Sequence, residues 1–339
     1  MSLAPQIAIP VGEPNQAGEA RRAAIRLAET IGFDEQARGE VAIVATELAT
    51  NLARYARHGS LLLQALPGPA GRTIEILSID AGPGMADLRA CLQDGYSTGG
   101  TPGNGLGAVR RLSTVFDIFS SAAGTAIVSR VSRGVEPRQP PSAFVWGVVS
   151  LPAPREQVCG DAWRIAEGEA GCAVMVADGL GHGPLAAEAS RLAGDVFDER
   201  PFDDAVALIE RAHRALAGSR GAALAIATIG GGALRYAGVG NIAGVLNGGE
   251  RPRGLASQNG TIGVQMRRAM ALEYPWPPSG RLVMHSDGLS SRWTLESYPG
   301  LAMRHPALAA AVLWRDCGRG RDDATIVVVG HGTAVPNHG

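Results

Sequence analysis

A short segment rich in proline, glycine and charge, residues 133–141, divides this chain of 339 residues into two parts. Strand-like periodicity stops at Arg133 and resumes near Phe144, which is typical of a linker between domains. The chain is also longer than one hydrophobic core usually supports, so two domains of ordinary size are expected. The predicted divisions are a first domain over 1–133, a linker over 134–142, a second domain over 143–332 and a tail over 333–339.

Charge and composition exclude several classes of protein. The net charge is −1, and acidic and basic residues are balanced in both halves, so we expect no nucleic-acid partner. All 31 basic residues are arginine, and the absence of lysine excludes P-loop nucleoside triphosphatases, ordinary protein kinases and Schiff-base enzymes. No apolar run is long enough to span a membrane, and the four cysteines form no CxxC pair. We therefore expect a cytoplasmic protein without a membrane segment.

The first part predicts helices on one face of a mixed sheet, which is a two-layer α/β sandwich. Its second helix carries an apolar stripe at helical spacing, formed by Val41, Val44, Leu48, Leu52 and Tyr55. The predicted helices span residues 15–31, 34–58, 85–93 and 106–115, and the predicted strands span 60–66, 73–79, 116–121 and 125–131.

Three polar features of this part can serve one nucleotide. Glu47 and Asn51 lie four residues apart on the second helix, so they share one face, where a carboxylate and a carboxamide can hold a metal ion. Asp80 follows an apolar strand and precedes glycines that let a planar ligand approach the backbone. The glycine-rich segment 99–107 then enters a helix, whose N-terminus offers backbone N–H groups to phosphates.

In this order the three features resemble the GHKL nucleotide fold of histidine kinases, gyrase and bacterial anti-sigma-factor kinases, and most closely the RsbT-like serine kinases. By this resemblance Asp80 would bind adenine, Asn51 would hold one Mg²⁺ with ATP, and Glu47 would orient the metal or act as a catalytic base. The glycines that would line the nucleotide are Gly82, Gly84, Gly103, Gly105 and Gly107. Phosphoryl transfer needs mainly positioning and charge neutralisation, which this set supplies without lysine.

The second part predicts two sheets flanked by helices, with an aspartate at the end of an apolar strand in four places. The four motifs are Gly160-Asp161, Asp178-Gly179-Leu180-Gly181-His182-Gly183, Ser286-Asp287-Gly288 and Arg321-Asp322-Asp323-Ala324-Thr325. Mg²⁺ and Mn²⁺ prefer carboxylate and water oxygens, and several such aspartates can hold a pair of ions that activate water for attack on phosphorus.

These motifs resemble the PPM superfamily of metal-dependent serine/threonine phosphatases, in its SpoIIE and RsbX branch, which implies a four-layer αββα sandwich. By the resemblance Asp178 would be the catalytic aspartate that bridges two metal ions, and the Gly179 carbonyl would bind one of them. Asp287 and Asp322 would bind the other ion, and Asp161 would hold a ligand or water position. The eukaryotic members of the superfamily bind the phosphate with an arginine near the start of the domain, and Arg155 and Arg164 are candidates for it by position only.

Together the two resemblances imply a bifunctional regulator of bacterial stress signalling by partner switching. It would remove phosphate from serine or threonine on STAS-domain scaffold or antagonist proteins and would phosphorylate them with ATP, upstream of a sigma-factor regulator. Two alternatives remain open at this point. The first domain can be an ATP-dependent docking module without kinase activity, or the second can be a degenerate phosphatase that only binds. The choice between Mg²⁺ and Mn²⁺ also stays open.

Overall fold

The computed structural model describes residues 5–66, 72–85, 87–91, 105–134 and 143–332. The chain forms two compact units, one within residues 2–140 and one within residues 141–339. Most of the predicted linker, the whole predicted tail and the predicted nucleotide residue Gly103 lie outside the described residues.

The first unit contains a five-stranded sheet with the strand order β1-β2-β3-β5-β4. Every neighbouring pair in it is antiparallel, so the prediction of a mixed sheet was wrong. The edge strand β1, which was not predicted, also pairs with its neighbour β2 in the antiparallel sense. The strands are β1 (Ile7–Val11), β2 (Gly59–Leu66), β3 (Arg72–Ile79), β4 (Val115–Ser121) and β5 (Gly124–Arg133).

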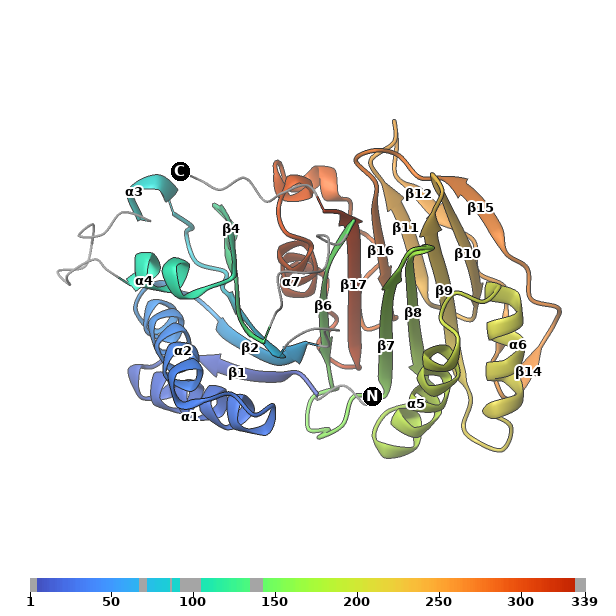
Figure 1. Ribbon diagram of the computed structural model, residues 1–339, viewed down its shortest axis with the longest axis horizontal. Helices are drawn as coiled ribbons and strands as arrows, with labels where there is room; N and C mark the ends of the chain where they lie inside the picture. Colours follow the sequence, from blue (N-terminus) through green and yellow to red (C-terminus); the bar gives the residue numbers. More distant parts are fainter. Residues whose placement is uncertain (1–4, 67–71, 86, 92–104, 135–142, 333–339) are drawn as a thin grey trace. The chain divides into compact units, whose positions relative to one another are not determined.

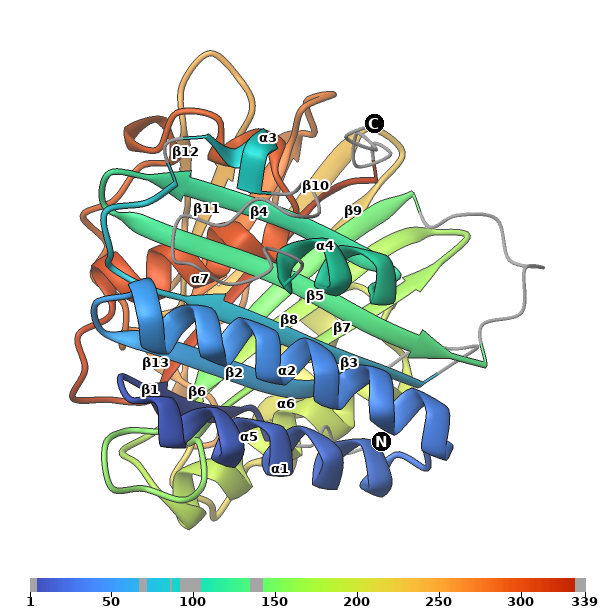
Figure 2. The same ribbon diagram turned by 90° about the vertical axis from the view of Figure 1, so that its left-hand side faces the viewer.

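Helices cover one face of this sheet (Figure 2). They are α1 (Pro14–Thr30), α2 (Glu35–Tyr55), the single turn α3 (Leu88–Cys91) and α4 (Gly105–Leu112). The Asp34 carboxylate caps α2 by accepting a hydrogen bond from the Ala37 N–H at 2.7 Å. The predicted stripe of α2 is buried from Val41 to Leu52, but Tyr55 is 49% exposed, because it ends the helix beyond the last buried turn. This unit is thus the two-layer sandwich that we predicted.

The second unit contains two five-stranded sheets and a small hairpin. One sheet has the order β15-β10-β9-β8-β7 and the other β12-β11-β16-β17-β6, while β13 and β14 pair with each other. The strands are β6 (Phe144–Leu151), β7 (Asp161–Gly168), β8 (Gly171–Gly179), β9 (Ala222–Gly230), β10 (Ala233–Val239), β11 (Ala243–Asn247), β12 (Arg253–Leu255), β13 (Gly260–Thr261), β14 (Gln265–Met266), β15 (Leu272–Pro275), β16 (Arg281–His285) and β17 (Ala324–His331).

Helices flank the pair of sheets on both outer faces (Figure 1). α5 (Pro184–Glu199) and α6 (Ala205–Ala215) contact the sheet of β7 to β10, and α7 (Pro306–Cys317) contacts β6 and β17. Two 3₁₀ turns, η1 (Leu295–Ser297) and η2 (Leu301–Met303), precede α7. A Cβ on Gly147 of β6 would lie 2.1 Å from the backbone of Ala307, so only glycine allows α7 to pack this closely. The architecture is the predicted αββα sandwich.

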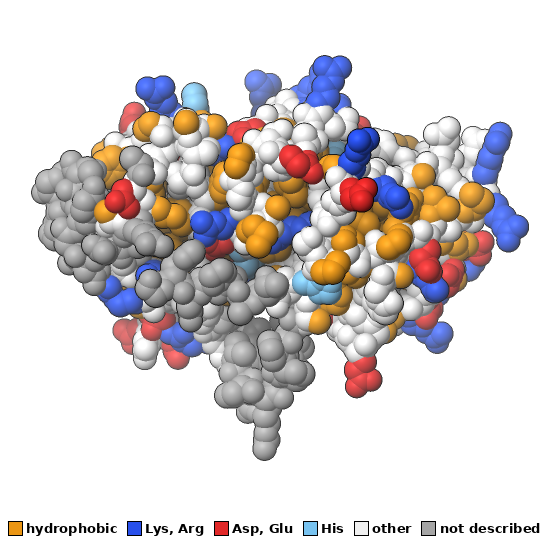
Figure 3. Space-filling view, turned by 90° about the horizontal axis from the view of Figure 1, so that it is seen from above, with side chains coloured by type: hydrophobic (Ala, Val, Ile, Leu, Met, Phe, Trp, Pro, Cys, Tyr) orange, Lys and Arg blue, Asp and Glu red, His pale blue; other side chains and the backbone are white. Residues whose placement is uncertain are grey.

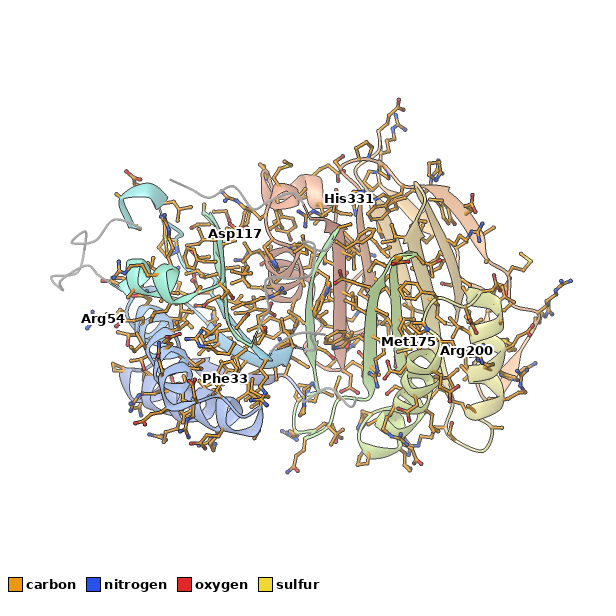
Figure 4. The ribbon with its side chains drawn as sticks, viewed as in Figure 1. Phe33, Arg54, Asp117, Met175, Arg200 and His331 are labelled. Carbon is orange, nitrogen blue, oxygen red and sulfur yellow. The ribbon has the colours of Figure 1, made fainter. Side chains whose placement is uncertain are left out.

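The core between α5, α6 and the first of these sheets is closely packed. Met175 of β8, labelled in Figure 4, lies fully buried in this core with Phe197 of α5 and Leu208 of α6. Because β8 is an interior strand of its sheet, with β7 and β9 as its neighbours, its end is held in place on both sides. Asp178 stands at that end.

Five short strands were not predicted: β1, β12, β13, β14 and β15. Each has five residues or fewer, so alternation in the sequence is too short to identify it, and each depends on pairing with a neighbour. Within the described residues, no helix is both long and apolar enough to cross a membrane.

Candidate functional site: two acidic centres

The strand ends of the second unit place two aspartates directly opposite each other. Asp161 begins β7, Asp178 lies near the end of β8, and the two are partners in the antiparallel register. Asp161 is 7% exposed, and Asp178 is half-buried. The Asp178 carboxylate accepts a hydrogen bond from the backbone N–H of Asp287, which belongs to the other sheet. The acidic residues of the two sheets therefore meet at this edge.

The second sheet contributes its aspartates from two neighbouring strands. Asp287 follows β16, and Asp322 and Asp323 precede β17, which pairs with β16. Asp322 is exposed, whereas Asp323 is buried and its Oδ1 accepts the Ala153 N–H at 2.8 Å. Asp323 thus fixes the loop after β6, while Asp322 stays available to a ligand.

Ser286 positions Asp161, although no sequence pattern assigned this serine a role. Its hydroxyl donates to Asp161 Oδ2 at 2.6 Å and accepts the backbone N–H of Thr325 at 3.0 Å. Ser286 is fully buried, so this contact joins the two sheets at the acidic edge. The residue stands in the Ser-Asp-Gly motif, directly before a predicted metal ligand, and that position is the available clue.

The crowding of carboxylates alters the acidity of this centre. Burial, followed by the charges of Asp287, Asp322 and Asp323, raises the pKa of Asp178 to about 7. Burial and the charge of Asp178 also raise the pKa of Asp161 well above its ordinary value, although the Ser286 hydrogen bond opposes this. Both directions mean that the ionised cluster is unfavourable until positive charge is added.

The donor set fits divalent cations. Asp161 Oδ1 is buried and accepts no hydrogen bond from the described residues, so it is an unused oxygen donor. Among the described residues, no three His, Cys, Asp or Glu side chains are grouped closely enough to form a complete ligand set. Ions here therefore need water and backbone carbonyls as further ligands, which is the usual coordination of Mg²⁺. The Gly179 carbonyl, next to Asp178, is the predicted backbone ligand.

Two further side chains lie near the acidic centre, although neither was predicted to bind metal. Asn241 Nδ2 donates to Asp287 Oδ2 at 2.9 Å and orients that carboxylate. His182, in the loop after β8, forms a 2.6 Å hydrogen bond with Glu156 and is largely exposed. Neither contact was predicted, because both partners are distant in the sequence.

The two arginines proposed by position lie in different surroundings. Arg164 is buried, donates to Asp198 at 3.1 Å and to the Trp163 carbonyl at 2.8 Å, and packs against Gly194 of α5. It is a structural residue and cannot reach a phosphate. Arg155 is exposed on the loop after β6, with a positive φ of 75°.

In the first unit, α2 and α4 bring two of the predicted nucleotide features together. A Cβ on Gly105, the first residue of α4, would lie 2.7 Å from Glu47 Oε2. The Glu47 carboxylate therefore lies against the start of α4, where backbone N–H groups are free of helical partners. Asn51 is one turn further along α2 and is half-buried. Gly107 lies within the first turns of α4, and its neighbours at 92–104, Gly103 included, are outside the described residues.

The turn after β3 contains the third feature. The Asp80 carboxylate accepts the Gly82 N–H at 2.6 Å, and the Ala81 N–H bonds to the Arg57 carbonyl at 2.8 Å just after α2. Gly84 has a φ of +76°, and a Cβ there would lie 2.1 Å from the Ser121 carbonyl oxygen, so only glycine fits. The turn is thus fixed between the end of α2 and the β4–β5 hairpin.

Basic and acidic side chains are interspersed over the face that Figure 3 presents. This distribution agrees with the balanced charge of the sequence.

Two known families match separate parts of the chain. Residues 11–130 match the histidine kinase-like ATPase domain family, and residues 168–331 match the family of stage II sporulation protein E, SpoIIE. The serine/threonine-protein kinase RsbT of Bacillus subtilis is 33% identical over 109 residues, which are 32% of this chain and 82% of RsbT.

Two solved structures show the fold of the larger part. One, from work on the bacterial stressosome as a modular system that controls secondary messenger signalling, is 24% identical, with a TM-score of 0.52, and covers 55% of this chain and 98% of its own. RsbX in complex with magnesium is 22% identical, with a TM-score of 0.51, and covers 57% of this chain and 98% of its own. The chain therefore belongs to the RsbT family of kinase-like ATPases through its first domain, which is fused to a SpoIIE-type phosphatase domain of the PPM superfamily.

Proposed function

We propose that this chain is a bifunctional partner-switching enzyme, which dephosphorylates serine or threonine on STAS-domain proteins and phosphorylates the same proteins with ATP. The observation that carries the proposal is the presence, in one chain, of a kinase-like ATPase domain and an acidic centre built from both sheets of a PPM-type domain. RsbX is known as a magnesium complex, which supports a divalent cation at the corresponding domain here.

In the phosphatase domain, Asp178 and the Gly179 carbonyl are proposed to hold one ion, and Asp178, Asp287 and Asp322 a second. Divalent ions supply positive charge for the phosphate and lower the pKa of bound water. Asp161, held by Ser286, is proposed to orient water at the buried side of the centre. The burial of Asp161 and Asp178, and the repulsion between their carboxylates, favour the cation-bound site over the empty site.

In the ATPase domain, Asp80 is proposed to bind adenine and Asn51 to bind the Mg²⁺ of ATP. The glycines proposed to line the nucleotide are Gly82, Gly84, Gly103, Gly105 and Gly107. Glu47 is proposed as the base that accepts the proton of the substrate serine. Its place against Gly105 supports this role, since the start of α4 is where phosphates would be bound.

The deciding experiment uses the full chain, a cognate STAS protein, ATP and Mn²⁺ or Mg²⁺. Wild-type protein should label the STAS protein with phosphate and, without ATP, should remove phosphate from the labelled form. Failure of both reactions with either metal would contradict the proposed function.

Glu47→Gln separates a kinase from a docking module. We expect this variant to lose phosphorylation by about a hundredfold or more, because general-base catalysis contributes on that order, while ATP still binds in calorimetry. Glu35→Gln, in the first turn of the same helix, is the matched control and should phosphorylate normally. Unchanged phosphorylation by Glu47→Gln would show that Glu47 is not the base. If wild-type protein binds ATP but transfers no phosphate, the first domain is a docking module.

A further inference from the structure

A hollow of about 470 Å³ opens beside the loop that follows Asp178. One wall is the outer surface of α5, with Leu185, Glu188 and Leu192, and the other is the segment after α6, residues 217–220. α5 begins at Pro184, directly after the loop 178–183, so this wall starts at the metal-binding motif. Neither the predicted ligands nor the hydrogen bonds around them involve this hollow.

The segment after α6 is held rigidly next to that loop. The Ser219 hydroxyl donates to the Leu216 carbonyl at 2.7 Å and accepts the Gly221 N–H at 3.0 Å. The Leu180 N–H donates to the Gly221 carbonyl at 2.9 Å, which ties the segment to the loop 178–183. The residue between Ser219 and Gly221, Arg220, is thereby kept at the metal-binding side of the hollow.

Arg220 has the properties of a phosphate ligand. A Cβ on Gly181 would lie 3.0 Å from its guanidinium, so the cation lies over the loop three residues after Asp178. Arg220 is exposed and forms no hydrogen bond or ion pair with the described residues. A free guanidinium can bind two oxygens of a phosphate at once. Arg164, by contrast, is occupied by Asp198.

Apolar side chains flank this cation. Leu180 and Leu185 are 46% and 53% exposed. Val264, which is 62% exposed, lies next to Gly221, since a Cβ on Gly221 would be 2.8 Å from Val264 Cγ2. Large apolar residues at this exposure gather where a partner binds. Glu188 makes the far end of the hollow unfavourable for an acidic residue.

We propose that this hollow binds the phosphorylated segment of the protein substrate, with Arg220 paired to the phosphoryl group and an apolar side chain near the phosphoserine seated between Leu185 and Leu192. The occupant follows from charge, because the Arg220 cation over the loop that follows Asp178 attracts a phosphate, and from the apolar residues Leu185 and Leu192 in the same hollow. This inference rests on the proposed phosphatase function and adds a substrate-binding residue to it.

The test measures kcat and KM of the full chain with Mn²⁺ on two substrates, p-nitrophenyl phosphate and a phosphoserine peptide with leucine two residues away. Arg220→Ala should raise KM for both about 10- to 100-fold, as expected for a lost charge-assisted contact, with kcat changed less. Arg220→Lys should recover part of the loss. Leu185→Ser should raise KM for the peptide about fivefold more than for p-nitrophenyl phosphate, and replacing the peptide leucine with aspartate should have a similar effect.

Arg235→Ala removes an exposed arginine of β10 that pairs with Glu273, and it should leave both KM values unchanged. Equal melting temperatures of wild type and Arg220→Ala would exclude a folding defect. KM values for Arg220→Ala within twofold of wild type would overturn the proposal, as would the same loss in Arg155→Ala but not in Arg220→Ala. If wild-type protein hydrolyses neither substrate, the phosphatase function itself fails, and that outcome is separate from the variant series.

Discussion

The candidate nucleotide site of the first unit and the aspartate cluster of the second place their carboxylates in different surroundings. Glu47 lies on α2, half-buried against Gly105 at the start of α4. Asp161 and Asp178 lie in a cluster assembled from two sheets, where burial and like charge raise the pKa of both. The cluster therefore contains an electrostatic cost that cations remove. The case for metal ions is stronger in the second domain.

The largest expected effect is the loss of phosphatase activity when Asp178 is replaced. Asp178→Asn removes the proposed bridging charge, so we expect phosphatase activity on a phosphopeptide to fall by about a thousandfold or more. ATP binding, measured by calorimetry, should not change, because the nucleotide centre uses no residue of this cluster. Asp195→Asn, an exposed residue of α5 paired with Arg191, is the matched control. Activity within tenfold of wild type would remove Asp178 from the metal site.

A smaller effect is expected at Ser286, which supports the cluster without being a predicted ligand. Ser286→Ala leaves Asp161 Oδ2 without its 2.6 Å hydrogen bond. Loss of such an outer contact typically weakens metal affinity about 10- to 100-fold. The measurement is a Mn²⁺ titration of phosphatase activity.

The control for this variant is Ser190→Ala. Ser190 is also buried, but its hydroxyl only donates to the Ala187 carbonyl within α5. An unchanged Mn²⁺ requirement in Ser286→Ala would contradict the proposed support of the metal site by Ser286 through Asp161.

Much of each site could be predicted from local sequence patterns. Asp178 and Asp287 follow apolar strands, and Glu47 and Asn51 lie four apart on a helix with a clear apolar stripe. These patterns involve neighbours in the chain, so they can be read without knowledge of tertiary contacts. The fold classes followed from the same runs of helices and strands.

The residues that were missed act across long distances in the sequence. Ser286 bonds to Asp161, Asn241 bonds to Asp287, and Arg220 lies over Gly181. A serine, an asparagine and an arginine are common on any surface, and only the meeting of strands and loops gives these three a role. The same reason explains the short strands such as β1, whose stability comes from pairing.

The smallest predicted effect concerns the metal-free protein and its dependence on pH. The pKa of Asp178 is raised from 3.8 to about 7 in the folded chain, so the folded state binds this proton more tightly than the unfolded state. The folded state then holds more protons between these two values, and the free energy of unfolding falls as pH rises through that window. The slope from one such group is at most about 1.4 kcal/mol per pH unit.

Denaturant unfolding in EDTA at pH 5.5 and 6.5 measures this slope, and a loss of about 1 kcal/mol of unfolding free energy is expected between them. Asp178→Asn cannot titrate at this position, so its slope should be smaller. Saturating Mn²⁺ should reduce the wild-type slope as well, because the bound ions favour the ionised carboxylate. Equal slopes in wild type and Asp178→Asn would mean that the Asp178 carboxylate adds no electrostatic cost to the folded state, and the case for cations at the cluster would lose this support.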